Sequence, residues 1–151
     1  MKKKIVIIAG DPNSINSEII YKTWKNLNNS IKKNLYIIGN YNLIKKQFKK
    51  LKIKQKIIKL ENIEFNKNII DLKIINIPLL FKKPFDVPLN SASKYVLSSL
   101  DLGHKLSMQE KIKGIINCPI DKKLIKKTKK PGVTELLASK CKLKNSSEAM
   151  M

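Results

Sequence analysis

The sequence predicts an α/β domain in which a mostly parallel β-sheet is flanked by helices. Short β-branched runs alternate with segments whose apolar residues recur at helical spacing, which is the pattern of βαβ units. The chain has 151 residues, of which 42% are hydrophobic. It is therefore long enough to build one compact core and short for two ordinary domains.

The first half of the chain is expected to form four strands and two helices. The first two strands are β-branched apolar runs that end at Gly10 and at Gly39. Apolar residues recur at helical spacing between Ile20 and Ile31, and a Lys-rich helix is expected over 43–51. The expected strands are residues 5–9, 35–38, 53–60 and 72–77.

The second half begins with a Pro-punctuated loop over residues 78–88. A helix should follow, capped by Ser91 or Ser93 and running to Met108. Its candidate core positions are Val96, Leu97, Leu100 and Leu106. The remaining expected elements are a strand over 115–118, a short helix around 124–125 and a helix over 134–141.

The net charge of the chain is +21 and is carried by Lys, because Arg is absent. Lys, Ile and Asn together make up 71 of the 151 residues. Nucleic-acid recognition favours clustered cations, forked Arg side chains and interleaved aromatic rings. Here Lys is spread through nearly every segment. We therefore interpret the excess as a compositional bias on solvated faces.

Several other classes of protein are not supported. The longest apolar runs fall far short of the roughly 20 residues of a membrane span, and the stretch after Lys4 is shorter than a secretory signal requires. Cys118 and Cys141 form no C-x-x-C pattern and are expected to be inert thiols of the core. His104, the sole histidine, is expected to be a partly buried helix residue. A cytoplasmic location is expected.

The first candidate site is the loop over residues 10–18, which follows the first strand. Ligands of α/β sheets gather at this edge, where loops lead into helix N-termini with free N–H groups. Asp11 and Glu18 either orient a ligand or brace the turn. The loop is not a P-loop and lacks the G-x-G-x-x-G pattern of dinucleotide sites.

The second candidate site combines residues 117–122 with residues 131–135. Lys122 is placed to meet a phosphate or carboxylate as a point charge. Thr134 either donates its hydroxyl to a ligand or caps the helix that it opens. From the residues alone, the conclusion is a cytosolic α/β domain with a candidate anion site.

Four blocks, in the same order and at similar spacing, resemble the 4-hydroxythreonine-4-phosphate dehydrogenases of vitamin B6 biosynthesis. Residues 10–18 resemble the family's G-D-P-A-G-I-G-P-E loop, and residues 93–103 resemble its A-x-Y-V-L-x-A-L-D-x-A helix. Residues 117–122 resemble T-A-P-[IV]-[HN]-K, and residues 132–138 resemble G-H-T-E-F-L-A. The resemblance covers nearly the whole chain but only about the first half of a typical family member.

The resemblance implies a two-domain enzyme like isocitrate and isopropylmalate dehydrogenases, acting as a homodimer. Such an enzyme oxidises 4-phosphohydroxy-L-threonine with NAD or NADP, and the β-keto acid then loses carbon dioxide. A divalent metal, Zn, Mg or Co, would act as the Lewis acid. Its three histidine ligands are expected beyond residue 151. Residues 1–151 are thus expected to be an N-terminal portion, inactive alone, as the strand-like ending over 146–151 also indicates.

Within this resemblance, Thr134 matches the substrate-binding threonine, and Lys122 is the candidate contact to the phosphate. Val133 stands where the family has a substrate-binding histidine, and valine donates no hydrogen bond. Ser14 and Asn16 replace two glycines of the first loop, which raises the question of that loop's conformation.

Two alternatives accompany this reading. One is a paralogous dehydrogenase of another phosphorylated hydroxy acid, a possibility that Val133 opens. The other, from a different class, is a small Lys-rich protein that binds nucleic acid or a membrane surface.

Overall fold

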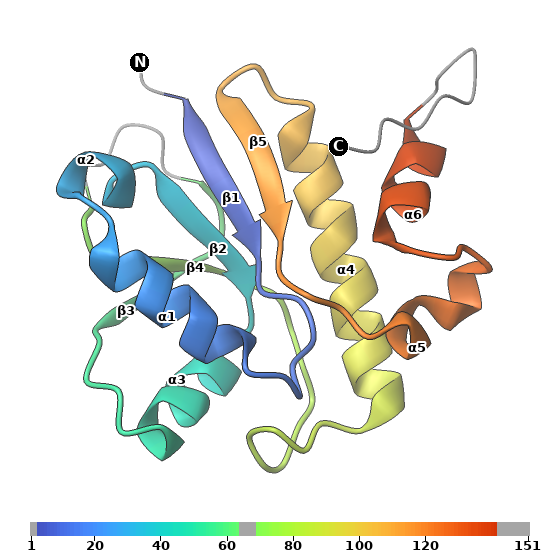
Figure 1. Ribbon diagram of the computed structural model, residues 1–151, viewed down its shortest axis with the longest axis horizontal. Coiled ribbons are helices and arrows are strands. Elements are labelled where there is room, and N and C mark those ends of the chain that lie inside the picture. The colour runs from blue at the N-terminus through green and yellow to red at the C-terminus, as the bar shows by residue number, and fades with distance from the viewer. Residues whose placement is uncertain (1–2, 64–68, 142–151) are drawn as a thin grey trace.

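A five-stranded parallel sheet forms the centre of the molecule (Figure 1). The computed structural model describes residues 3–63 and 69–141. The strand order is β3-β4-β2-β1-β5. The strands are β1 (Lys4–Ile8), β2 (Leu35–Gly39), β3 (Ile57–Leu60), β4 (Leu72–Asn76) and β5 (Ile112–Asn117). The predicted α/β class with a parallel sheet is confirmed.

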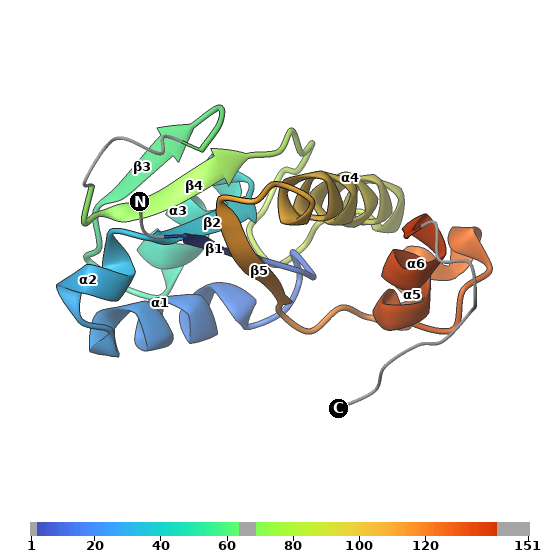
Figure 2. The same cartoon turned by 90° about the horizontal axis from the view of Figure 1, so that it is seen from above.

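Helices cover both faces of this sheet, with α1 and α3 on one face and α4 on the other (Figure 2). This arrangement follows from the connections, because the links that contain α1, α3 and α4 are crossovers between parallel strands that pack back onto the sheet. The helices are α1 (Asn16–Asn26), α2 (Asn29–Lys32), α3 (Tyr41–Lys50), α4 (Leu89–Ser107), α5 (Lys122–Ile125) and α6 (Val133–Lys140). A 3₁₀ turn (Lys126–Thr128) joins α5 to the segment before α6.

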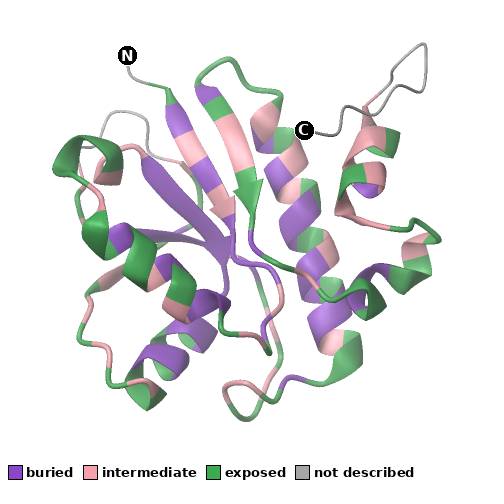
Figure 3. Ribbon diagram, viewed as in Figure 1, coloured by how far each residue is buried: buried purple, intermediate pink, exposed green. Residues whose placement is uncertain are grey.

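The core consists of two layers, one on each face of the sheet. Successive strand residues point to opposite faces, so Ile37 packs with Trp24 of α1, whereas Ile38 packs with Leu100 of α4. β2 lies in the middle of the sheet and is buried along its whole length, while β5 at the edge is largely exposed or half-buried (Figure 3).

Several predicted elements differ from the structure at their ends, and the strand expected over 115–118 begins three residues earlier, at Ile112. The helix expected to reach Ile31 ends at Asn26, and the side chain of Asn28 then accepts the Ile31 N–H at 2.9 Å and starts α2. The strand expected from residue 53 begins at Ile57, because Ile53 still closes the end of α3 through a hydrogen bond to the Phe48 carbonyl.

The prediction of a serine cap for α4 is wrong. The helix begins at Leu89 and carries no side-chain cap. Ser93 instead donates its hydroxyl to the Leu124 carbonyl at 2.6 Å, which ties α4 to α5. Val96 and Leu100 are buried as expected, whereas the candidate core residue Leu97 is only half-buried.

Within residues 3–63 and 69–141, no helix combines the length and the apolar character that crossing a membrane requires. The strand-like ending expected over 146–151 lies outside the described residues.

Candidate functional site

The direction of the strand connections reverses between β1 and β5. From β1 the chain runs through α1 to β2 on one side, and from β4 it returns through α4 to β5 on the other side. In open α/β sheets, such a switch point leaves a crevice outside the carboxyl ends of the two strands. Both candidate loops, 10–18 and 117–122, follow these two strands, so the structure brings them together.

Asn16 closes the crevice between the two loops. Its buried side-chain amide donates to the Ala9 carbonyl at 2.9 Å and to the Pro119 carbonyl at 2.8 Å. The Asp11 N–H also donates to the Pro119 carbonyl, at 3.3 Å. One side chain therefore hydrogen-bonds to carbonyl groups at the ends of two neighbouring strands.

Gly10 makes this close approach possible. Its φ is +73°, and a Cβ atom placed there would lie 2.7 Å from the Pro119 carbonyl oxygen. Ser14 and Asn16, in contrast, do not have positive φ values. The two positions at which the family has glycine therefore accept side chains without strain in this chain, and the question about the conformation of the first loop is resolved.

Side chains from two other segments hold the first loop in place. Asn13 donates to the Val87 carbonyl at 2.9 Å and accepts the Val87 N–H at 2.7 Å, although the residues are 74 positions apart. Gln47 of α3 donates to the Pro12 carbonyl at 2.8 Å. The loop is thus fastened to α3 and to the segment before α4.

The two acidic residues of this loop are engaged locally. Asp11 accepts the Asn13 N–H at 2.8 Å and so braces the turn. Glu18 forms an ion pair with Lys22 one turn along α1, at 2.7 Å. Of the two roles open to Asp11 and Glu18, the structure supports bracing the turn for Asp11.

Ser17 differs from its neighbours in the first loop. Its hydroxyl oxygen is buried and has no hydrogen-bond partner, and it is the only such side-chain atom in the described part of the chain. A cavity of about 10 Å³ adjoins it, next to Gln47 and Tyr95. A space of this size corresponds to a single water molecule.

Lys122 and Thr134 lie beyond β5, on the excursion formed by α5, the 3₁₀ turn and α6 (Figures 1 and 2). Lys122 is the exposed first residue of α5, which Asp121 caps by accepting the Lys123 N–H at 2.9 Å. Thr134 is exposed in the first turn of α6. The N-cap residue of α6 is Gly132 and no side chain caps the helix, so the alternative that Thr134 acts as the cap is wrong.

Val133 occupies a different environment from Thr134. It is half-buried and packs against the core layer that includes Leu136. Its apolar side chain thus contributes to holding α6, while the neighbouring Thr134 hydroxyl makes no hydrogen bond within the described part of the chain. The structure packs one side chain against the core and leaves the other exposed to solvent.

The excursion is attached to α4 rather than to the sheet. Leu124 and Leu136 bury their side chains in the core layer of α4, and Lys140 of α6 pairs with Asp101 of α4. Ser93 adds its hydrogen bond to α5. These contacts fix the position of the first turn of α6 relative to the crevice.

The described residues do not assemble a metal centre. No group of three or more His, Cys, Asp or Glu side chains occurs among them. His104 is half-buried on α4, as expected, and Cys118 is buried, which raises the pKa of its thiol to about 11. A thiol with this pKa stays protonated near neutral pH and is a poor nucleophile. Cys141, expected in the core, is only half-buried.

Sequence reasoning missed the asparagines that hold the segments at the carboxyl ends of the strands. Asn40 was detectable, because it follows a strand at Gly39 and precedes a helix, and it caps α3 by accepting the Leu43 N–H at 2.8 Å. Asn13 and Asn16 were not detectable, since the contacts that tie them to other segments span 74 and 103 positions. No local pattern marks a contact of that range.

Solved structures with a similar fold are 4-hydroxythreonine-4-phosphate dehydrogenases. A candidate enzyme of this name from Salmonella typhimurium matches with 23% identity and a TM-score of 0.73, over 92% of this chain and 44% of its own. The enzyme from Klebsiella pneumoniae matches with 21% identity and a TM-score of 0.72, over 91% and 44%. The enzyme from Burkholderia phymatum matches with 21% identity and a TM-score of 0.69, over 92% and 43%.

The chain therefore spans less than half the length of these proteins. No match was found among curated protein sequences. A family model described as pyridoxal phosphate biosynthetic protein PdxA matches residues 12–151. This match covers nearly the whole chain and includes the second candidate loop and residues 12–18 of the first. The chain therefore belongs to the PdxA family of pyridoxal phosphate biosynthetic proteins.

Proposed function

We propose that this chain is the N-terminal portion of a 4-hydroxythreonine-4-phosphate dehydrogenase. The enzyme would oxidise 4-phosphohydroxy-L-threonine with NAD or NADP, and the resulting β-keto acid would lose carbon dioxide. The product would enter pyridoxal phosphate synthesis in the cytoplasm. The observation that carries the proposal is the family match over residues 12–151, which the parallel sheet and its fold relatives support.

The contribution of this chain would be one wall of the substrate site. Thr134 would donate its hydroxyl to the substrate, because it is exposed in the first turn of α6 and makes no other hydrogen bond within the described residues. Lys122, also exposed, would attract the phosphate as a point charge. The contacts of α5 and α6 with α4 would hold these two groups in a constant orientation, which lowers the entropic cost of reaching the transition state.

The metal and the nicotinamide cofactor would be held elsewhere. The described residues contain no cluster suited to a divalent cation, and the loop over 10–18 lacks the glycine pattern of a dinucleotide site. The residues of this chain would therefore bind neither the divalent cation nor the nicotinamide cofactor. The histidine ligands for Zn, Mg or Co would come from beyond residue 151, in a homodimer of two-domain subunits.

A second candidate function is the oxidation of a different phosphorylated hydroxy acid. Val133 stands where the family has a substrate-binding histidine, and it packs against the core instead of offering a hydrogen bond. A site that hydrogen-bonds a substrate hydroxyl discriminates strongly against a ligand without that hydroxyl. Replacing the histidine by Val133 removes one such hydrogen-bonding group, and this would alter substrate preference. The comparisons give no support to a small nucleic-acid- or membrane-binding protein.

The proposal is tested by assaying NADH formation from 4-phosphohydroxy-L-threonine with a divalent cation. The protein extended to the length of its fold relatives should form NADH, and chelation of the cation should abolish the reaction. The 151-residue chain alone should be inactive. Metal-dependent activity of that chain alone would show that the metal ligands do not lie beyond residue 151, which contradicts the proposal. Failure of the extended protein with this substrate, together with turnover of another phosphorylated hydroxy acid, would favour the second candidate.

A further inference from the structure

A cavity of about 650 Å³ lies between α3 and the segment that leads into β3. It is distinct from the crevice between β1 and β5, since none of its lining residues belongs to the loops over 10–18 or 117–122. Its volume falls within the range of roughly 300–1,000 Å³ that is typical of sites for small organic ligands.

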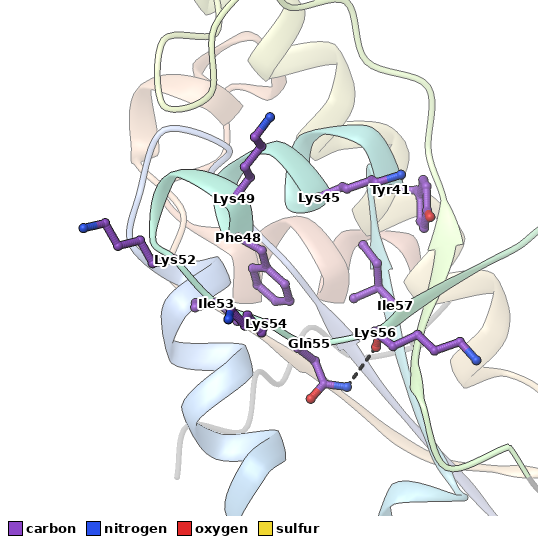
Figure 4. A pocket seen from close by; sticks show the side chains of 10 residues that line it. All are labelled: Tyr41, Lys45, Phe48, Lys49, Lys52, Ile53, Lys54, Gln55, Lys56 and Ile57. Carbon is purple, nitrogen blue, oxygen red and sulfur yellow. Dashed lines mark hydrogen bonds between the residues drawn. The ribbon is translucent and has the colours of Figure 1, made fainter.

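The inner surface of the cavity is apolar. Phe48 is almost fully buried, and Tyr41, Ile53 and Ile57 are half-buried around it. Figure 4 shows the Phe48 ring and the Ile57 side chain in the middle of the view, between α3 and the segment before β3. A ligand with a planar apolar body would remove the exposed surfaces of Tyr41, Ile53 and Ile57 from water, which is favourable by about 25 cal/mol per Å² of apolar surface.

The shape of this inner surface is set by the turn that ends α3. The Lys52 N–H donates to the Lys49 carbonyl at 3.2 Å, and the Ile53 N–H donates to the Phe48 carbonyl at 2.9 Å. With Lys52 at a φ of +57°, these bonds form a Schellman motif, whose characteristic apolar contact joins Phe48 and Ile53. The apolar surface therefore belongs to a regular helix end and does not depend on a loose loop.

The rim of the cavity is positively charged. Five exposed lysines line it, and in Figure 4 the ammonium groups of Lys49, Lys52 and Lys56 point outward from the apolar centre. The lining lysines are Lys45, Lys49, Lys52, Lys54 and Lys56. Within the described residues, only Lys56 has a carboxylate partner, Asp71 at 3.6 Å.

The general excess of Lys does not account for this charge by itself. No Asp or Glu occurs from residue 19 to residue 60, although the chain contains 11 acidic residues. A bias towards Lys adds cations everywhere but does not remove carboxylates from one segment. Because like charges gathered around an apolar cavity raise the local potential, an anion bound there would be stabilised.

We propose that this cavity binds a small organic anion, with a planar apolar body against Phe48 and Ile57 and phosphate or carboxylate groups among the rim lysines. Lys is suited to such groups as a flexible point charge. The site would act independently of the dehydrogenase reaction, because its residues do not overlap the crevice.

The test uses 1-anilinonaphthalene-8-sulfonate as a probe, since it joins an apolar ring system to one anionic group. Fluorescence titration of the full chain should show saturable binding of one probe per chain. The uncharged analogue N-phenyl-1-naphthylamine should bind at least tenfold more weakly. Equal affinity for the two dyes would overturn the proposal, because the rim charge would then play no part.

Charge reversals locate the site. Lys45→Glu combined with Lys54→Glu should weaken probe binding at least tenfold. The matched control, Lys126→Glu with Lys127→Glu, makes the same change in net charge at exposed positions of the 3₁₀ turn and should change affinity less than twofold. Equal losses in both double variants would indicate a general charge effect and overturn the proposal.

Two single variants test the site in case the double variant does not fold. Lys54 lies outside both α3 and β3, so Lys54→Glu alone should fold and still weaken binding about threefold. Ile57→Thr keeps a β-branched residue in β3 while removing apolar surface, and it should also weaken binding about threefold. Unchanged affinity in both folded variants would overturn the proposal.

Discussion

The side-chain amide of Asn16 donates a hydrogen bond to the main-chain carbonyl of Pro119 over 2.8 Å, across 103 positions of sequence. Asn16 opens α1, and Pro119 follows β5, so this bond joins the two loops on either side of the switch point. The same amide also holds the Ala9 carbonyl at 2.9 Å. At the edge of the sheet where α/β proteins bind ligands, a buried side chain thus bonds the two loops to each other.

Replacing Asn16 by Ala should lower the free energy of unfolding by about 1–2 kcal/mol, since the Ala9 carbonyl loses the Asn16 amide and the Pro119 carbonyl keeps only the Asp11 N–H. Urea unfolding monitored by circular dichroism measures this change. Asn42→Ala, at an exposed position of α3, should change stability by less than about 0.5 kcal/mol. Equal effects of the two substitutions would contradict the role assigned to the Asn16 amide.

Gly10→Ala should destabilise the protein by about 2–3 kcal/mol, because the backbone has a φ of +73° and the new Cβ would lie 2.7 Å from the Pro119 carbonyl oxygen. Gly114→Ala is the matched control, since no atom lies within 4 Å of a Cβ at that position. Thermal unfolding of both variants checks the difference. A Gly10→Ala protein as stable as the control would mean that the two loops can separate without cost.

Lys73 should make the protein more stable as the pH rises. Its buried ammonium donates to the Lys32 and Ile69 carbonyls at 2.8 and 2.7 Å. Burial, aided by the charge of Lys4, lowers the pKa of Lys73 from 10.5 to about 8. Between these two pH values, the unfolded chain binds more protons than the folded chain, so the free energy of unfolding rises with pH.

The Lys73→Met variant isolates this contribution, because the other titrating groups are common to both proteins. Urea unfolding across about pH 8 to 10.5 should show a smaller rise for Lys73→Met than for the unchanged chain. Lys25→Met, at an exposed position, should keep the original pH dependence. Parallel curves for the unchanged chain and Lys73→Met would refute the prediction.

Lys52→Gly should stabilise the chain by about 0.5–1 kcal/mol. Lys52 has a φ of +57° at the end of α3, a conformation that costs a residue with a Cβ atom more than it costs glycine. Lys54→Gly is the control, because Lys54 has no positive φ and the change adds only freedom to the unfolded chain. Denaturant midpoints that fall for both variants would argue against strain at Lys52.

Thr134→Val, made in the protein extended to the length of its fold relatives, should weaken substrate binding more than NAD binding. The exposed hydroxyl makes no hydrogen bond within the described residues, so stability should change by less than about 0.5 kcal/mol. Thr134→Ser retains the hydroxyl and should restore most of the affinity. Calorimetric titration measures both dissociation constants, and an equal loss for substrate and NAD would contradict the assignment.

The sequence by itself determined the alternation of strands and helices and the family. The runs over residues 5–8 of β1 and 35–38 of β2 are continuous and apolar, because a central parallel strand is covered on both faces. The four family blocks depend on local strings of residues, and the family match extends over the same region. The sequence did not predict the ends of helices correctly where a side chain caps a new helix. Asn28, for example, caps α2 within the segment predicted as one continuous helix.

Only the tertiary structure decided how the two loops meet and where the site residues point. Asn13 and Asn16 bond to segments 74 and 103 positions away, and such pairing arises from the order of strands in the sheet. The opposite environments of Val133 and Thr134 follow from the docking of α6 against α4. The cavity beside α3 likewise forms only when the end of that helix and the start of β3 pack together, because neither segment encloses a volume alone.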